Sequence, residues 1–463
     1  MPVFRTLVTL LVVCIAAVIG FIALAWRSAI DPIAAQAQNF SPELIKRGGV
    51  LAALGDCKTC HTAAGGRAFA GGLALPTPFG TIYSTNITPD ADTGIGRWSE
   101  DAFRRALREG VDREGRQLYP AFPYDHFTLA TDEDIAALYA YAMTRDPVRA
   151  ITPANDLAFP FNIRPLLAGW KLLFLRQGPY RADPGQSAAW NRGAYLVEGL
   201  AHCGACHTPR DALGAERKRN SFGGGDTEGW NAYALNQSAP APAHWDETAL
   251  GLYLRNGWHE AHGVAHGPMA PVIDNLASIA DSDIAAIATY MASIAGAPSA
   301  QQRLAADAIV EQARQRKPGS KPAAAEGQAV GQSDNDKGPG AALYQAACAG
   351  CHDSSRPLPF GGVDLARSTG PSAADPRNVI NTVLYGLPVA DAEPGPIMPS
   401  FADVLTDAQL ANLIAYVRSQ FGNKPPWTDI AKAVRDARSD GSRVGVYPAP
   451  GIDLTHMLAR EAR

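Results

Sequence analysis

The sequence predicts an all-α fold in which three small helical domains follow one N-terminal apolar helix. Three observations lead to this prediction: an uncharged apolar stretch near the N-terminus, a cysteine motif that occurs three times, and an amphipathic helix pattern that follows each motif. The length of 463 residues corresponds to about three domains. A composition with 46% hydrophobic and 19% charged residues excludes wholesale disorder, and the net charge of −4 gives no sign of a nucleic-acid-binding protein.

The N-terminal region 1–30 is predicted to be a membrane anchor. No charged residue lies between Thr6 and Trp26, and the 20 residues from Leu7 to Trp26 would form a helix about 30 Å long, which matches the hydrocarbon core of a bilayer. A cleaved signal peptide is the alternative, with a small-residue cleavage site at Ala35-Gln36-Ala37. Because the apolar region of a signal peptide normally spans only about 7–15 residues, the length favours an uncleaved transmembrane helix.

The six cysteines beyond this helix form three C-x-x-C-H motifs, a spacing typical of covalent haem c attachment. In such a motif two thiols form thioethers with the vinyl groups of one porphyrin, and the histidine binds the iron. A thioredoxin-like pair would not need the histidine each time, and a zinc site would need two pairs to converge. The sequence therefore predicts three covalently bound haem c groups, attached at Cys57, Cys60 and His61, at Cys203, Cys206 and His207, and at Cys348, Cys351 and His352.

The motifs recur at domain scale, because 146 residues separate Cys57 from Cys203 and 145 separate Cys203 from Cys348. This internal repeat predicts one small helical domain around each haem. The apolar stretch Leu166–Leu175 makes the first connection too long for a bare linker, so we expect it to pack between domains or against a partner. The predicted boundaries are a first domain at 40–145, a strap at 146–188, a second domain at 189–297, a helix with a flexible linker at 298–338, a third domain at 339–422 and a tail at 423–463.

A second repeat predicts the sixth ligand of the iron. Each motif is followed by a glycine that would end a helix, and 12 residues beyond these glycines the chain has Phe122, Met269 and Met398. Proline flanks both methionines and would hold their thioethers rigidly, so Met269 and Met398 are predicted axial ligands. Helices beginning near an aspartate and reaching a tyrosine follow each loop. The three glycines are Gly110, Gly257 and Gly386; the helices run from Ile135 to Tyr141, from Ile284 to Tyr290 and from Leu410 to Tyr416, and the aspartates that precede them are Asp132, Asp281 and Asp407.

The first repeat departs from this pattern, because the side chain of Phe122 cannot bind iron. His126, four residues further on, is the favoured ligand; a five-coordinate iron capped by Phe122 and ligation by Met143 are the alternatives. Three histidines near Met269 could form a metal site, although a solvated loop is the preferred interpretation. These three are His259, His262 and His266.

With these motifs in place, the chain resembles the tri-haem cytochrome c subunits of bacterial membrane-bound dehydrogenases over nearly its whole length. The landmarks are Gly80–Pro89, Gly94–Ser99, Asn191–Leu196 and Pro426–Thr428. The resemblance implies a subunit in the bacterial inner membrane with its haem domains in the periplasm. Such a subunit has no substrate-oxidising site; it takes electrons from a catalytic dehydrogenase subunit, in some complexes with an iron–sulfur subunit, and passes them to ubiquinone or a terminal oxidase.

The first-repeat loop narrows the resemblance, because alcohol- and gluconate-type members carry methionine where this chain has Phe122. The variant with Phe122 and Asp125-His126-Phe127 looks more like cytochromes that accompany molybdenum hydroxylases, which oxidise aldehydes or N-heterocycles such as isoquinoline and nicotinate. The alternatives are the cytochrome subunit of a quinoprotein alcohol or flavoprotein gluconate dehydrogenase, a peroxidase-like enzyme with an open first haem, and a soluble redox shuttle.

Overall fold

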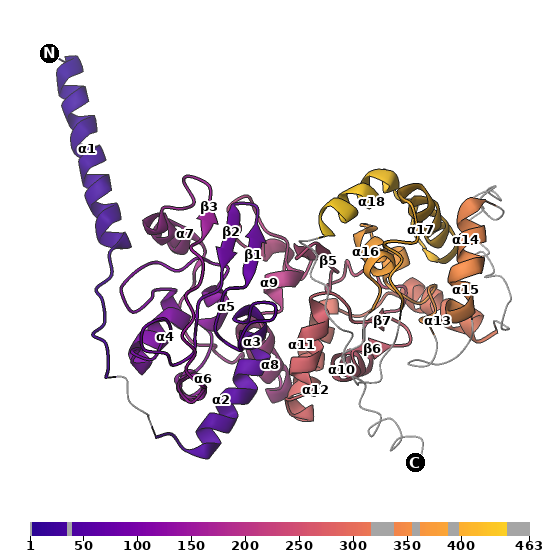
Figure 1. The fold of residues 1–463 in the computed structure, drawn as a ribbon, viewed down its shortest axis with the longest axis horizontal. Helices are drawn as coiled ribbons and strands as arrows, with labels where there is room; N and C mark the ends of the chain where they lie inside the picture. Colours follow the sequence, from indigo (N-terminus) through magenta and orange to yellow (C-terminus); the bar gives the residue numbers. More distant parts are fainter. Residues whose placement is uncertain (1, 35–38, 316–337, 354–361, 388–397, 442–463) are drawn as a thin grey trace. The chain divides into compact units, whose positions relative to one another are not determined.

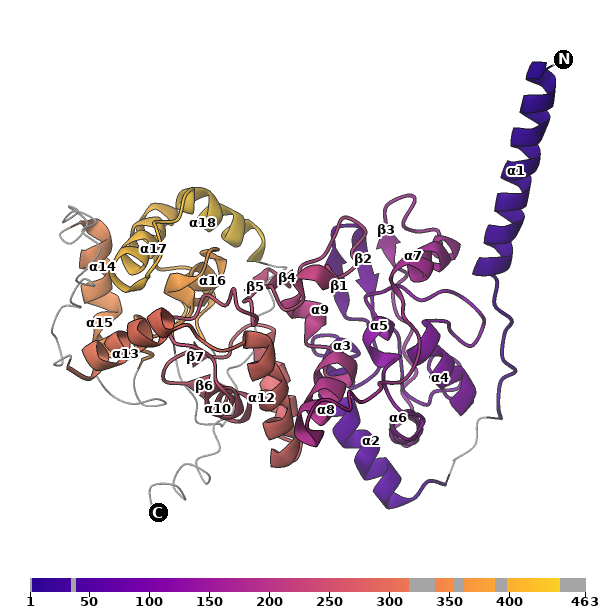
Figure 2. The same ribbon diagram turned by 180° about the vertical axis from the view of Figure 1, so that it is seen from behind.

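The computed structural model describes residues 2–34, 39–315, 338–353, 362–387 and 398–441. The chain divides into two compact units. Unit one comprises residues 1–184 and 195–202, and unit two comprises residues 185–194 and 203–463. Figures 1 and 2 show the elements of both units from opposite sides.

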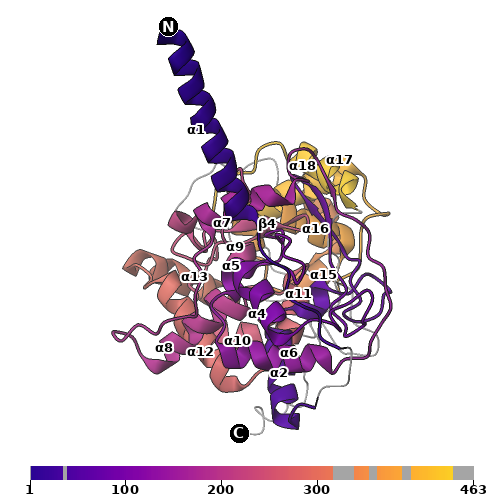
Figure 3. The ribbon, with the colours of Figure 1, turned by 90° about the vertical axis from the view of Figure 1, so that its left-hand side faces the viewer.

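Helix α1, Pro2–Ala25, is a single helix that extends away from the rest of unit one (Figure 3). Its segment Val3–Ala25 is long and apolar enough to cross a membrane. Hydrogen bonds attach its C-terminal end and the residues that follow to the folded part of the unit. Among them, Gln117 Nε2 donates to the carbonyl of Ala25 at 2.8 Å, and the backbone N–H of Ile30 donates to the carbonyl of Arg113 at 2.9 Å. The predicted apolar helix is thus present as a continuous element.

Unit one combines helices with one small antiparallel sheet. In the sheet, β2 lies between β1 and β3, with Ala74 opposite Tyr83 and Thr81 opposite Asp156. Its elements after α1 are α2 (Pro42–Leu54), α3 (Cys57–Cys60), β1 (Ala74–Thr77), β2 (Gly80–Tyr83), α4 (Glu100–Glu109), α5 (Tyr124–Phe127), α6 (Asp132–Met143), β3 (Asp156–Leu157), η1 (Arg164–Leu166), α7 (Leu167–Phe174) and η2 (Leu196–Leu200).

Unit two contains the second and third motifs and most of the remaining helices. Two antiparallel hairpins, β4 with β5 and β6 with β7, accompany them. The elements are α8 (Ala188–Tyr195), α9 (Gly204–His207), η3 (Lys218–Asn220), β4 (Gly225–Thr227), β5 (Trp230–Ala232), α10 (Glu247–Asn256), β6 (Trp258–His259), β7 (Gly263–Val264), α11 (Met269–Leu276), α12 (Asp281–Ala295), α13 (Ala300–Gln315), α14 (Pro339–Ala347), α15 (Ala349–His352), η5 (Gly370–Ser372), α16 (Arg377–Tyr385), α17 (Asp407–Phe421) and α18 (Ile430–Ser439).

The short strands are a departure from the all-α prediction. They contain only two to four residues each, so period-two alternation is too brief to be visible in the sequence. One of them depends on a glycine: Gly80 has φ 124°, and a β-carbon there would lie 2.2 Å from the carbonyl oxygen of Asp156 on β3. The fold is therefore mainly helical, with small hairpins in the loops between helices.

The same helix crossing occurs three times. In each case a glycine of the helix before a motif lies against the backbone of a later helix. The contacted residue of that later helix is four positions before the tyrosine of the repeat. Only a residue without a side chain permits this approach. A β-carbon at Gly48 would lie 1.9 Å from the carbonyl oxygen of Ala137. A β-carbon at Gly193 would lie 2.0 Å from that of Ala286, and one at Gly340 would lie 2.2 Å from that of Asn412.

The connecting segments pack in different ways. The strap at 146–188 contributes β3 and α7 to unit one, and its Ala168 and Leu175 side chains are buried there. The linker at 298–338 begins with α13, while residues 316–337 lie outside the described part of the chain. The tail contributes α18 to the core that surrounds α16 and α17, where Val434 is fully buried; its residues 442–463 lie outside the described part.

Candidate haem centres

The three motifs lie on or beside one-turn helices, where the two cysteines and the histidine of each motif are close in space. The helices are α3, α9 and α15; α3 and α15 come soon after the helix that contains the crossing glycine, and η2 lies between that helix and α9. None of the six motif cysteines, all of which the structure describes, is in a disulfide. Pairs of thiols separated by one helical turn suit two thioether bonds to one porphyrin.

Each motif histidine has the same second contact. Nδ1 of His61 is 2.7 Å from the carbonyl oxygen of Thr85. Nδ1 of His207 is 2.7 Å from that of Tyr233, and Nδ1 of His352 is 2.8 Å from that of Val363. Because a carbonyl can only accept, the proton lies on Nδ1, and Nε2 carries the lone pair that iron needs. Burial lowers the pKa of all three imidazoles, which favours the neutral, metal-binding form.

Burial also acts on the motif thiols. It raises the pKa of Cys57 to about 12 and that of Cys348 to about 11, with nearby acidic side chains and, for Cys348, the second thiol adding to the effect. Before haem attachment these side chains are therefore neutral thiols at physiological pH, a poorly reactive form. The residues present fit covalently attached haem: two thiols and an oriented neutral imidazole occur at all three positions.

The two predicted methionine ligands are both half-buried in unit two. Met269 is half-buried at the first position of α11, directly after Pro268. Met398 is half-buried against the core of the third repeat, and its carbonyl accepts the N–H of Leu387 at 2.9 Å. Gly386 has φ 70°, and a β-carbon there would lie 2.3 Å from the carbonyl oxygen of Met398. The three predicted capping glycines each end a helix, and Gly110 and Gly257 do so in the left-handed region with φ 61° and 75°.

Arginines that the sequence analysis did not single out hold the chain between each ligand position and the following helix. Arg108 donates to the carbonyls of Thr128 and Ala130 and pairs with Asp132 at 2.9 Å. Arg255 repeats this arrangement in unit two. It donates to the carbonyls of Leu276, Ala277 and Ile279 and pairs with Asp281 at 2.5 Å.

The third repeat has the same arrangement with an arginine from elsewhere. Arg438 of α18 donates to the carbonyls of Ala402 and Leu405 and pairs with Asp407 at 2.6 Å. Arg108 and Arg255 both lie two residues before their capping glycine, a signal that the sequence offered. Arg438 follows Asp407 by 31 residues, and no motif marks it.

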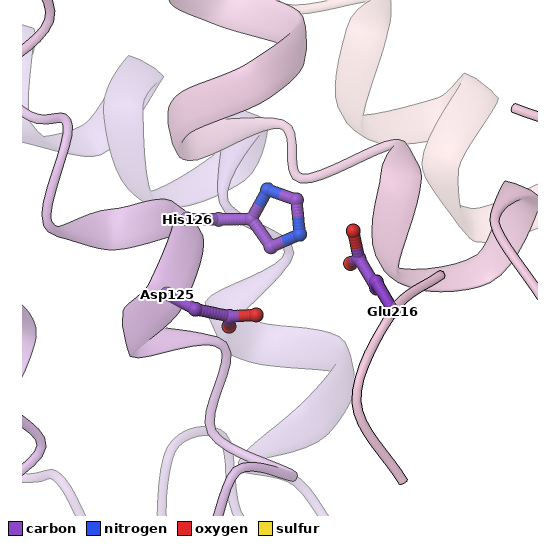
Figure 4. A group of neighbouring side chains, drawn as sticks. All are labelled: Asp125, His126 and Glu216. Carbon is purple, nitrogen blue, oxygen red and sulfur yellow. The ribbon is translucent and has the colours of Figure 1, made fainter. Parts of the chain in front are cut away.

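His126 is buried in unit one, with 2% of its surface exposed. Its Nδ1 lies 2.7 Å from the carbonyl oxygen of Glu198, the same arrangement that orients the motif histidines. His202 is its ring neighbour at 6.5 Å between centroids, and Phe122 packs on Phe127 at 5.3 Å. Figure 4 shows Asp125 and His126 side by side on α5; Glu216, also drawn, belongs to unit two. Ligation of the first haem by His126 stays a prediction.

The loop histidines near Met269 are not the solvated residues that the preferred interpretation expected. His262 is 6% exposed and stacks on Trp245, with centroids 3.4 Å apart and planes at 12°. Burial lowers its pKa to about 3, with the neighbouring His259 and Arg367 contributing. His266 lies edge-on to Trp230 at 5.0 Å. These contacts are aromatic packing, which depends on tertiary neighbours that the sequence does not reveal.

Comparison with known proteins gives matches over most of the chain. The family described as cytochrome C oxidase, cbb3-type, subunit III, matches residues 335–417. One of the subunits of nicotinate dehydrogenase from Pseudomonas putida is 45% identical over 90% of this chain, which spans only 34% of that relative. The fructose dehydrogenase cytochrome subunit of Gluconobacter japonicus is 39% identical, with 89% of this chain and 86% of the relative covered. The gluconate 2-dehydrogenase cytochrome c subunit of Pantoea cypripedii is 37% identical, with 86% and 90% covered.

Proposed function

Since the chain belongs to the family of cytochrome c subunits of dehydrogenase complexes, we propose that it is a tri-haem subunit that carries electrons from a catalytic dehydrogenase to the respiratory chain. The observation that carries the proposal is the threefold motif geometry, with Nδ1 of His61, His207 and His352 each on a backbone carbonyl. Bound haem supplies one-electron chemistry. The chain itself holds each imidazole neutral and aimed, and sets the surroundings that tune potential.

The proposed assignment of domains and ligands follows from the repeats. Haem domains at 40–145, 189–297 and 339–422 each contain one motif and one glycine crossing. Met269 and Met398 complete the second and third irons, and His126 completes the first. Thioether ligation favours a raised potential and bis-imidazole ligation a lower one, so the three haems would differ in potential.

The proposed partner is a molybdenum hydroxylase that oxidises an N-heterocycle or an aldehyde, in some arrangements with an iron–sulfur subunit. The 45% identity to a nicotinate dehydrogenase subunit, against 39% and 37% to the fructose and gluconate relatives, supports this choice. The loop with Phe122 and His126 supports it as well. Helix α1 would tether the chain to the inner membrane, with the haem domains in the periplasm and ubiquinone or a terminal oxidase as acceptor.

We expect the chain purified in complex with its partner to contain three haems and to be reduced by the partner's substrate. Its intact mass after denaturation should exceed that of the polypeptide by three haems, because thioether bonds survive denaturation. Cys206→Ser and Cys351→Ser serve as matched variants in which the number of thioether bonds falls at one site only. A parent mass with two haems or fewer would contradict the count, and haems that stay oxidised with substrate would contradict the electron-transfer role.

A further inference from the structure

The outer face of α7 is apolar and exposed. Leu172 and Leu173 are 64% and 60% exposed, whereas Ala168 and Lys171 of the same helix are buried. The segment before α7 adds further exposed apolar side chains, which are those of Phe159, Phe161, Ile163 and Leu166. A group of large apolar side chains exposed along one segment of a folded protein is a candidate interaction site.

The inner face fixes the direction in which these leucines point. The ammonium of Lys171 donates to the carbonyls of Glu109 and Gly110 at 2.7 and 2.5 Å and to Gln117 Oε1 at 2.7 Å. It also lies 4.8 Å from the centre of the Tyr124 ring. The three acceptors around this buried side chain hold the helix in place, so its exposed leucines keep their outward direction.

Helix α7 lies beside the end of the candidate membrane helix (Figure 3). A β-carbon at Gly169 would lie 3.7 Å from the ring of Phe21 on α1. Leu24 and Arg27 share a cavity of about 360 Å³ with Lys171 and Leu172. The apolar face therefore occurs at the level where α1 ends, which is also the level of Trp26, exposed at 70%.

We propose that the outer face of α7, with Phe159–Leu166 before it, lies in the headgroup layer of the membrane that α1 crosses. The proposal rests on the proposed membrane anchor. Its occupant is an anionic lipid surface, because an exposed apolar face next to Arg27 and Arg176 has the composition of an interfacial helix. This contact would fix the orientation of unit one relative to the bilayer, which a single helix leaves undetermined.

The test is depth measurement with spin labels on the haem-loaded full chain in vesicles of phosphatidylethanolamine and phosphatidylglycerol. Native Cys14, which lies in α1, reports on the anchor. Leu172→Cys and Leu304→Cys, each combined with Cys14→Ser, report on α7 and on a control site in α13 that is 71% exposed. We expect the ratio of oxygen to nickel-chelate accessibility to be several-fold higher at position 172 than at 304.

Three outcomes would overturn the proposal. If the labels at 172 and 304 have the same accessibility ratio while Cys14 is shielded from nickel, α1 is in the membrane and α7 does not contact it. A label at 172 shielded from both relaxants indicates a protein surface over α7 in place of lipid. Nickel access at Cys14 removes the anchor itself, and the α7 proposal with it.

A second inference concerns α18. It is independent of the first, because the contacts that support it lie within unit two. At the position where the first two repeats have Arg108 and Arg255, the third has Leu384, which is 1% exposed. Arg438, which lies in the tail, makes the corresponding contacts in the third repeat. In each of the three repeats, the arginine donates to the carbonyl of the residue two positions before the aspartate that begins the next helix. The helix is fixed in turn, since Tyr385 Oη donates to the carbonyl of Ala437 at 2.9 Å.

We infer that Arg438 is a positioning residue for the chain that leads from Met398 into α17, and so for the sixth ligand of the third haem. The inference rests on the proposed ligation by Met398. Three contacts from one guanidinium to Ala402, Leu405 and Asp407 fix the second half of that segment, and the N–H of Phe401 and the N–H of Ala402 donate to the carbonyls of Val383 and Leu384. A planar fork of this kind cannot be replaced by an ammonium without loss of contacts.

The test compares Arg438→Met and Arg438→Lys with Arg435→Met, which changes an exposed arginine of the same helix. The readouts are the reduction potential of each haem and the thioether–iron charge-transfer band during urea titration. Arg438→Met removes all three contacts, and the loss of even one charged hydrogen bond should raise the population without thioether ligation about tenfold or more. Arg438→Lys should lie between that variant and the parent.

Unchanged ligation in Arg438→Met, in a protein where Met398→Ala does alter one haem, would overturn the inference while leaving the ligand assignment in place. If Met398→Ala alters no haem, the proposed ligation fails first, and the inference with it. An equal effect of Arg435→Met would show that the charge of α18, and not the guanidinium contacts, is responsible, which also overturns it.

Discussion

Replacing Met269 or Met398 by alanine is expected to lower the reduction potential of one haem and to leave the other two unchanged. A thioether stabilises the reduced iron, and alanine offers no ligand in its place. The shift should be a sizeable part of the roughly 0.8 V over which axial ligands set haem potentials. Because the two methionines lie in different repeats, the double variant should show two shifted haems.

The measurement is a spectroelectrochemical titration with the thioether–iron charge-transfer band as the second readout. Met291→Leu is the control, because Met291 is a buried methionine of α12 that no repeat assigns to an iron. Leucine conserves its volume, so packing should change little. Unchanged potentials and an unchanged band in both alanine variants would show that the 12-residue interval from the capping glycine does not identify ligands.

The second large effect is expected at the first haem. His126→Ala should convert one haem from low-spin to high-spin and allow that haem to bind carbon monoxide, because loss of an imidazole opens the sixth position. The contact between Nδ1 of His126 and the carbonyl of Glu198 supports this role, since the motif histidines are oriented in the same way. In the parent, this haem should have the lowest potential of the three.

Two results would contradict ligation by His126. If the parent already binds carbon monoxide at one haem, the first iron is open and a peroxidase-like activity becomes the hypothesis to test. If His126→Ala leaves all three haems low-spin, Met143 at the end of α6 is the next ligand to replace. Phe122→Met, which restores the residue of the other two repeats, gives a matched variant expected to raise the potential of this haem in a background without His126.

The sequence contains enough to predict the haem motifs, the capping glycines and the helices that end each repeat. These features depend on neighbours close in the chain: a capping glycine follows its own helix, and Asp132 begins the helix that contains Tyr141. The structure adds the orientation of His61 by Thr85, a partner 24 residues away. That contact involves a backbone carbonyl, and every residue has one, so no residue type could have indicated it.

Other features could not be predicted because they depend on tertiary neighbours. The burial of His262 follows from its stacking on Trp245, and the strands are too short for a periodic signal. Arg438 is the clearest case. The first two repeats contain their arginine two residues before the capping glycine, whereas the third receives it from α18, after the repeat has ended.

The dependence of the third repeat on α18 has a consequence for biogenesis. If the chain is exported from its N-terminus, as the proposed periplasmic location requires, Cys351 crosses the membrane 87 residues before Arg438. In the first two repeats the arginine precedes the aspartate with which it pairs, whereas in the third repeat the arginine follows it. Under the proposed function the third domain would therefore be the last to close, and the tail would complete it.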